Sequence, residues 1–279
     1  MTAEQKKWSP VALDAALVRE ARRVLSQQPE GLATVPLARR IFKMAALPEV
    51  VAEKMLRALL ESDGSFSEKN GRWYLKTKPF SWKRPLVSTP FVVLDLEIIG
   101  RGQNTKIVEL AAVKILENQL TETFYTLVNP GRPLSPGWFK EPRFSQADLD
   151  QAPKIGPVLE DFLRFAEASI WVAHNARFDL RALNLELRRT TYFRIANPVV
   201  DTLPLVRHYF PNLDAHNLPQ LAAYFGIELE DHHHARSDAQ ALAEIFLKIL
   251  HFIENEGFNS LEVFKPFSLP NPWEEIGKE

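Results

Sequence analysis

The chain has 279 residues and contains no cysteine, only three methionines and no long hydrophobic run. Without cysteine it cannot form disulfides, thiolate zinc sites or iron–sulfur clusters. Its apolar stretches stay short of the roughly 18 residues that a membrane span requires. The N-terminal sequence Met-Thr-Ala-Glu-Gln-Lys-Lys lacks the apolar core of a secretory signal. We therefore expect a cytoplasmic protein without a membrane partner.

Charge is distributed unevenly, although the whole chain carries a net charge of only −1. Residues 1–85 contain 16 Lys+Arg against 9 Asp+Glu, and the remaining 18 basic and 26 acidic residues leave the rest of the chain acidic. A basic part favours contact with a polyanion, and the acidic surplus includes carboxylates that a cation could neutralise. The alternative is a chance imbalance between solvated faces.

The first part of the chain reads as three helices followed by a hairpin. Ser9-Pro10 offers an N-cap and a proline in the first turn, and apolar spacing predicts further helices over 34–44 and 48–62. Asn70-Gly71 between two short β-prone stretches is a strong hairpin signal. This order of elements resembles a winged-helix domain, a resemblance of pattern rather than of any specific motif.

The expected wing combines cations with flat aromatic rings, a composition suited to a single nucleic-acid strand or a duplex end. Trp73 and Tyr74 lie among these cations in the sequence. One alternative is a structural hairpin whose aromatic rings belong to the core, and another is a protein-docking module. The candidate strand contacts are Lys69, Arg72, Lys76 and Lys78.

Beyond residue 90 the pattern changes to three successive strands and then to strands alternating with helices. Such an order predicts an α/β domain with a mixed sheet flanked by helices. The expected strands are 91–94, 106–115, 122–128, 170–173 and one beginning at 199, and the expected helices are 155–168, one from 176 and 235–252. The expected division of the chain is a winged-helix-like domain 1–78, a linker 79–89, the α/β domain 90–254 and a C-terminal tail 255–279.

Four acidic residues occupy positions that suit a shared cation site. Asp95 and Glu97 project to the same side at the end of a buried strand, where two like charges repel unless a cation lies between them. Asp179 lies in a first helical turn, and Asp238 falls on the inward stripe of the last helix. Taken singly, each has an ordinary alternative, either a solvated strand end or an acid that favours the helix macrodipole.

Three consecutive histidines, 232–234, precede the last helix. An imidazole suits proton abstraction near neutral pH because its reference pKa is about 6.5. The triplet could instead form a transition-metal patch or an exposed loop. Position alone does not choose among the three.

Taken together, these stretches resemble the DEDD exonucleases of the histidine subtype, which include the proofreading (epsilon) subunits of bacterial DNA polymerase III. The motifs follow in the family's order: Asp95-x-Glu97 after an apolar strand, His174-Asn-Ala-x-Phe-Asp179, and His233-x-Ala-x-x-Asp238. The intermediate stretch Asp201-Thr-Leu-x-Leu-x-Arg agrees as well. The resemblance covers about three-fifths of the chain.

The resemblance implies an RNase H-like fold and a metal-dependent 3′–5′ exonuclease that releases nucleoside 5′-monophosphates. It also implies two Mg²⁺ or Mn²⁺ ions held by the four carboxylates, and a general base at His233, which alone fits the family spacing. Oxygen ligands without thiolates agree with such hard cations. The implied catalytic residues are Asp95, Glu97, Asp179, His233 and Asp238.

The resemblance also carries over a set of substrate-binding positions. Where the family usually continues with Thr-Thr-Gly, this chain has Ile98-Ile99-Gly100, so the preference between DNA and RNA stays open. We expect nucleic acid as the partner, with single-stranded DNA or 3′ ends favoured and RNA not excluded. The implied substrate-binding residues are Leu96, Ile98, Ile99, His174, Asn175 and Phe178.

Other functions stay open beside this one. The same fold could keep an idle site and serve only as a nucleic-acid-binding or partner-binding subunit of a replication or repair assembly. In a separate hypothesis, which is compatible with an active exonuclease, the N-terminal module docks a partner in a larger repair or replication assembly. A 3′–5′ exoribonuclease directed at RNA is the remaining alternative.

Overall fold

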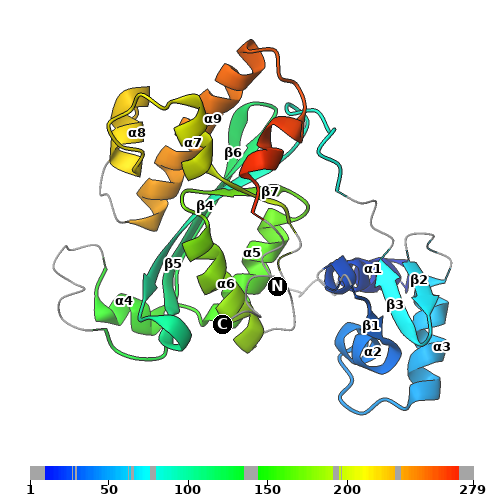
Figure 1. Ribbon diagram of the computed structural model, residues 1–279. Helices are drawn as coiled ribbons and strands as arrows, with labels where there is room; N and C mark the ends of the chain where they lie inside the picture. The colour runs from blue at the N-terminus through cyan, green and yellow to red at the C-terminus, as the bar shows by residue number, and fades with distance from the viewer. Residues whose placement is uncertain are drawn as a thin grey trace, which may run out of the picture. The chain divides into compact units, whose positions relative to one another are not determined.

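The computed structural model describes residues 10–26, 28, 30–61, 63, 66–75, 80–134, 144–190, 195, 197–229 and 234–269 (Figure 1). The chain divides into two compact units, with the boundary between Phe80 and Ser81. Within the described ranges, no helix is long and apolar enough to cross a membrane.

In its described residues, the N-terminal unit contains three helices and a three-stranded antiparallel sheet in the order β1-β3-β2. Asn70 and Gly71 form the hairpin turn with positive φ angles of 52° and 71°, as the Asn-Gly signal predicts. Strand β1 has only two residues, too few to show a periodic pattern. The winged-helix assignment stays a prediction. The elements are α1 (Pro10–Ser26), β1 (Leu32–Ala33), α2 (Thr34–Phe42), α3 (Glu49–Leu60), β2 (Phe66–Lys69) and β3 (Arg72–Leu75).

The hairpin uses part of its expected strand-binding surface for its own structure. Trp73 is buried, and the guanidinium of Arg72 donates hydrogen bonds to the carbonyl oxygens of Gly31, at 2.8 Å, and Glu30, at 3.2 Å. Lys69 is exposed. Lys76 and Lys78 lie outside the described residues. Trp73 and Arg72 therefore stabilise the N-terminal unit itself, as the structural alternative for the hairpin predicts.

The second unit is built on a five-stranded sheet in the order β6-β5-β4-β7-β8. The first three strands are antiparallel neighbours, whereas β7 and β8 run parallel to β4, so the sheet is mixed as predicted. The parallel strands deliver their carboxyl ends to one edge, where acidic residues can meet. The strands are β4 (Phe91–Ile99), β5 (Lys106–Leu116), β6 (Gln119–Leu127), β7 (Ile170–Ala173) and β8 (Val199–Asp201).

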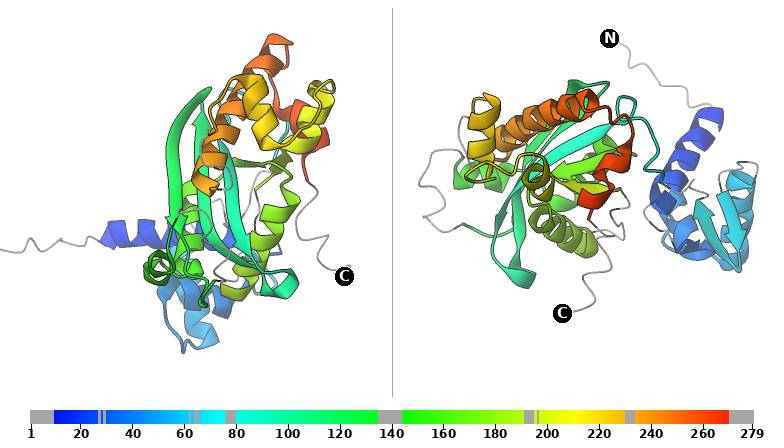
Figure 2. Two further views of the ribbon diagram at one scale, coloured as in Figure 1. Left: turned by 90° about the vertical axis from the view of Figure 1, so that its left-hand side faces the viewer. Right: turned by 45° about the horizontal axis from the view of Figure 1, so that its top comes forward.

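Helices cover both faces of this sheet, and Figure 2 shows α6 and α9 on opposite sides of it. On the α9 side, Ala235 and Ala239 pack against Ala111 of β5. On the other side, Phe124 of β6 packs against Phe162 of α5, with ring centroids 5.7 Å apart. The elements are α4 (Gln146–Gln151), α5 (Ile155–Ala166), α6 (Arg177–Thr190), α7 (Thr202–Tyr209), α8 (Leu218–Phe225), α9 (Ala235–Asn255) and the 3₁₀ helices η1 (Gly102–Asn104) and η3 (Leu261–Phe267).

The segments expected as linker and tail pack against each other and against the sheet. The Leu86 N–H donates to the Asn259 carbonyl at 3.0 Å, and the Leu269 N–H donates to the Val199 carbonyl of β8 at 2.9 Å. Phe264 of η3 is fully buried between Phe91 and Phe246. A short 3₁₀ segment has no long apolar period, which explains why the sequence pattern did not reveal this packing.

Replacing Phe264 with alanine should lower the free energy of unfolding by about 3–5 kcal/mol, because it removes a fully buried ring and leaves a cavity. Chemical denaturation measures the change. The matched control is Phe258→Ala, since Phe258 is 47% exposed, and it should cost less than about 1 kcal/mol. Equal losses in the two variants would contradict a packed role for η3.

Candidate active site

Two carboxylates lie at the end of β4. Phe91–Leu94 are buried and hold the strand in the centre of the sheet, so Asp95 and Glu97, two residues apart, project to one side at its end. Asp238, in the first turn of α9, is only 5% exposed. One carboxylate oxygen from each of these three residues lies within 4.8 Å of the other two. Segments separated by more than 140 residues thus supply one cluster.

Asp179 adds a fourth carboxylate from the first turn of α6. Burial raises the pKa of Asp179 to about 7, and the charge of Asp201 adds to this rise. Hydrogen bonds from its own backbone and from the backbone of Leu96 act in the opposite direction. The contact with Leu96 places Asp179 beside the end of β4.

Asp95 lies at the centre of the repulsion between these groups. Burial raises its pKa well above the usual range for aspartate, and the charges of Asp179, Asp238, Glu97 and Glu109 raise it further, in that order. Carboxylates gathered in this way favour either a proton or a cation. A donor set made only of carboxylate oxygens fits hard divalent cations such as Mg²⁺ or Mn²⁺.

Glu109 is a buried acid that the motif analysis missed. It pairs with Glu97 across β4 and β5, and it is 0% exposed. Its carboxylate lies 2.8 Å from Nδ1 of His234 and accepts a hydrogen bond from the Ala235 N–H at 3.3 Å. Glu109 therefore fastens the start of α9, the helix that carries Asp238. The sequence feature that could have revealed Glu109 is its position as a single acid inside the apolar run of β5.

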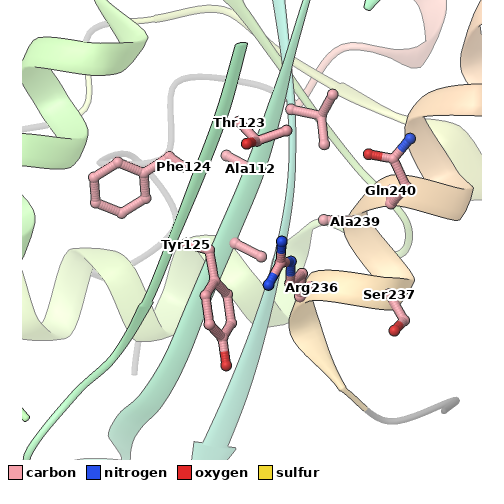
Figure 3. A pocket seen from close by; sticks show the side chains of 10 residues that line it. Ala112, Thr123, Phe124, Tyr125, Arg236, Ser237, Ala239 and Gln240 are labelled. Atoms are coloured by element: carbon pink, nitrogen blue, oxygen red, sulfur yellow. The ribbon is translucent and has the colours of Figure 1, made fainter.

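A pocket of about 340 Å³ lies between β5, β6 and the start of α9 (Figure 3). Tyr125 forms part of its wall, with the guanidinium of Arg236 over its ring at 5.3 Å. Ala111 pairs with both Asp95 and Tyr125, so Asp95 and the pocket lie on one face of the sheet. The described residues that line the pocket include none of the four acids.

Two of the expected substrate-binding residues make contacts within the protein. His174 is half-buried, its Nδ1 lies 2.9 Å from Oγ1 of Thr202, and burial lowers its pKa. The Asn175 N–H donates to Oδ1 of Asp201 at 2.9 Å. Phe178, by contrast, is 64% exposed and available to a ligand.

The three expected contacts on β4 have different surroundings. Ile99 is buried in an apolar cluster with Val108 and Leu149, which leaves its side chain little surface for a ligand. Leu96 is also buried and reaches the site through its backbone, whereas Ile98 is half-buried. Gly100 follows with φ of +79°, at a turn where a side chain would collide with the Asn104 carbonyl.

The expected general base, His233, lies outside the described residues. The structure describes His234, which caps α9 by accepting a hydrogen bond from the Arg236 N–H. His234 also contacts Glu109, and its ring stacks on Tyr125 with centroids 5.8 Å apart. His234 is therefore engaged in holding the helix start.

Comparisons with known proteins identify the family to which this part of the chain is similar. Residues 92–246, more than half of the chain, match the profile of the exonuclease family named after RNase T. A PolC-type DNA polymerase III from Caldanaerobacter subterraneus is 38% identical over 172 residues, 61% of this chain and 12% of that protein. The PolC-type DNA polymerase III of Bacillus subtilis is 37% identical over 169 residues, 60% of this chain and 12% of that protein. The chain thus spans about an eighth of the length of these relatives.

Solved structures share the fold at low sequence identity. The nuclease domain of 3′hExo, described as a DEDDh family member bound to rAMP, superimposes with a TM-score of 0.52 at 16% identity, covering 61% of this chain and 95% of that one. Cell-death related nuclease 4 gives a TM-score of 0.52 at 13% identity, covering 60% of this chain and 65% of that one. The RNase H-like exonuclease fold expected from the motifs is confirmed. With its matched profile and its cluster of acids, the chain belongs to the exonuclease family, as its resemblance to the DEDD enzymes predicted.

Proposed function

We propose that this chain is a metal-dependent 3′–5′ exonuclease that hydrolyses nucleic acid, with DNA favoured over RNA, and releases nucleoside 5′-monophosphates. The observation that carries the proposal is the meeting of Asp95, Glu97 and Asp238 oxygens within 4.8 Å, with Asp179 beside them. Relatives named DNA polymerase III support DNA as the substrate and a replication or repair protein as a partner.

The four acids would hold two divalent cations, Mg²⁺ or Mn²⁺. When bound, such cations supply Lewis-acid chemistry that polarises the scissile phosphate and stabilises charge on the oxygens that attack and leave. The protein contributes the arrangement of the ligands. Asp95 and Glu97 are fixed by the central strand of the sheet, whereas Asp179 and Asp238 are fixed by the first turns of two helices.

The remaining steps fall to side chains around the acids. A ring nitrogen of His233 would accept the proton of the attacking water, a role suited to an imidazole near neutral pH. The exposed ring of Phe178, one residue before Asp179, would contact the terminal nucleotide. Lys69, together with Lys76 and Lys78, would contact the strand from the N-terminal unit, where Lys69 is exposed.

Incubation of 5′-labelled single-stranded DNA with the protein and Mg²⁺ should give a ladder that shortens from the 3′ end and disappears with a chelator. Asp95→Asn and Asp179→Asn should each lower kcat by about 10³-fold, because each removes a charged ligand of the cation site. Asp161→Asn is the matched control. Asp161 is exposed, and within the described part of the chain it forms an ion pair with Arg164. This variant should retain full activity.

A matched RNA oligonucleotide distinguishes the alternatives in the same assay. Faster degradation of RNA than of DNA would replace the proposed substrate with an exoribonuclease assignment. Binding of either strand without any product, at Mg²⁺ and Mn²⁺ concentrations that activate a control exonuclease, would support the idle binding subunit instead.

Repulsion among the acids also affects stability. A carboxyl group whose pKa is raised on folding, as for Asp95 and for Asp179 at about 7, destabilises the fold as pH rises from about 4 through that pKa. The metal-free protein should therefore melt at a lower temperature at pH 8 than at pH 5, and Mg²⁺ should raise Tm more at pH 8 than at pH 5. Differential scanning fluorimetry measures both effects.

The same repulsion predicts that Asp95→Asn raises the stability of the metal-free protein at pH 8 by about 1 kcal/mol, or a Tm increase of about 2–4 °C. Asp161→Asn again serves as the control and should change Tm by less than about 1 °C, because exposed ion pairs contribute little. A lower Tm for Asp95→Asn than for the wild type would contradict the charge repulsion inferred among the acids.

A further inference from the structure

Asp179 of α6 follows a turn at His174 and Asn175, and this turn contacts Asp201 at the end of β8 and Thr202 at the start of α7. Strands β7 and β8 lie side by side in parallel, with Ala173 in register with Asp201. After β7, the chain passes through His174 and Asn175 into α6, and Asp179 follows in the first turn of that helix. Asp179 thus follows closely after this turn in the chain.

Asp201 accepts two backbone hydrogen bonds on one oxygen. Its Oδ1 accepts from the Asn175 N–H and from the Leu203 N–H, each at 2.9 Å. The first bond holds the turn before α6, and the second caps α7. Asp201 is only 5% exposed, so its carboxylate depends on partners within the protein such as these two N–H groups.

Thr202 provides a second contact to the same turn. Its hydroxyl lies 2.9 Å from Nδ1 of His174 and is fully buried within the fold. Two consecutive residues, 174 and 175, thus contact two consecutive residues, 201 and 202. Asn175 itself has φ of +58°, a left-handed conformation that asparagine tolerates better than most residues.

We infer that Asp201 is a positioning residue that holds the Asn175 turn and so directs Asp179 into the cluster of acids. Because Asp179 is assigned as a metal ligand, this inference rests on the proposed function. The acids whose oxygens lie within 4.8 Å of one another are Asp95, Glu97 and Asp238, whereas Asp201 accepts hydrogen bonds from the turn before Asp179 and from α7. In the sheet order β4-β7-β8 it stands two strands from Asp95, about 10 Å in the hydrogen-bonding direction.

The inference reassigns His174 and Asn175 as well. Both were expected to contact substrate, yet the Nδ1 atom of His174 and the backbone N–H of Asn175 are occupied by Thr202 and Asp201. Their influence on the reaction then passes through Asp179. The carboxylate charge of Asp201 suits the N-terminus of α7, but an uncharged acceptor of the same shape would still hold the turn.

The decisive comparison is Asp201→Asn against Asp201→Ala. Asparagine keeps an oxygen at the Oδ1 position, so Asp201→Asn should keep kcat within about threefold of the wild type, whereas Asp201→Ala should lower kcat at least about tenfold with KM changed less than about twofold. If Asp201→Asn is as inactive as Asp201→Ala, the charge is required and the inference fails. It also fails if Asp201→Ala keeps wild-type kcat.

Hydrogen exchange gives a readout that does not depend on activity. In full-length protein without metal, Asp201→Ala should speed exchange at the Asn175 and Leu203 amides, and Asp201→Asn should not. Unchanged exchange in Asp201→Ala would overturn the inference. A wild type that cleaves no nucleic acid but follows this exchange pattern would refute the proposed function while supporting the positioning role.

A milder pair of variants covers the case in which Asp201→Ala does not fold. Thr202→Val removes the hydroxyl at nearly constant shape, and Thr202→Ser keeps it. The valine variant should speed exchange in the 174–176 turn and lower kcat about threefold or more, whereas the serine variant should match the wild type. Equal behaviour of the two variants would contradict the second contact.

Discussion

The packing of the second unit has to outweigh one unfavourable interaction, the repulsion among the carboxylates that the fold brings together at the end of β4. Burial and neighbouring charge both raise the pKa of Asp95, and the groups that act on it come from β4, β5, α6 and α9. Repulsion of this kind persists only where the surrounding packing outweighs it. The buried strand Phe91–Leu94 and the buried face of α9 supply that packing.

The supports of the acids share one design, in which a buried polar group holds the first turn of a helix. Glu109 contacts the residues at the start of α9, and Asp201 holds the turn that leads into α6. In each case an acceptor from the sheet bonds a backbone N–H close to a carboxylate of the cluster. Backbone contacts fix direction more firmly than a mobile side chain would, because the backbone has few soft dihedral angles.

Much of the fold and the acids could be predicted from the sequence because both follow short-range rules. The alternation of β4 placed Asp95 and Glu97 on one side, and the helical stripe placed Asp238 inward. The burial of Ile99, the role of Glu109 and the packing of Phe264 were not predictable in this way. Each depends on contacts between distant segments, which local periodicity does not encode.

The pairing of the expected linker with the expected tail has a consequence for where this unit can be cut. Because Leu86 bonds to Asn259 and Arg84 bonds to Leu261, the segment before β4 and the segment after α9 satisfy each other's backbone groups. The packing continues beyond this pairing, since Phe264 is buried and the Leu269 N–H donates to the Val199 carbonyl of β8. A fragment that started at β4 or stopped at the end of α9 would therefore expose surface that the whole unit buries.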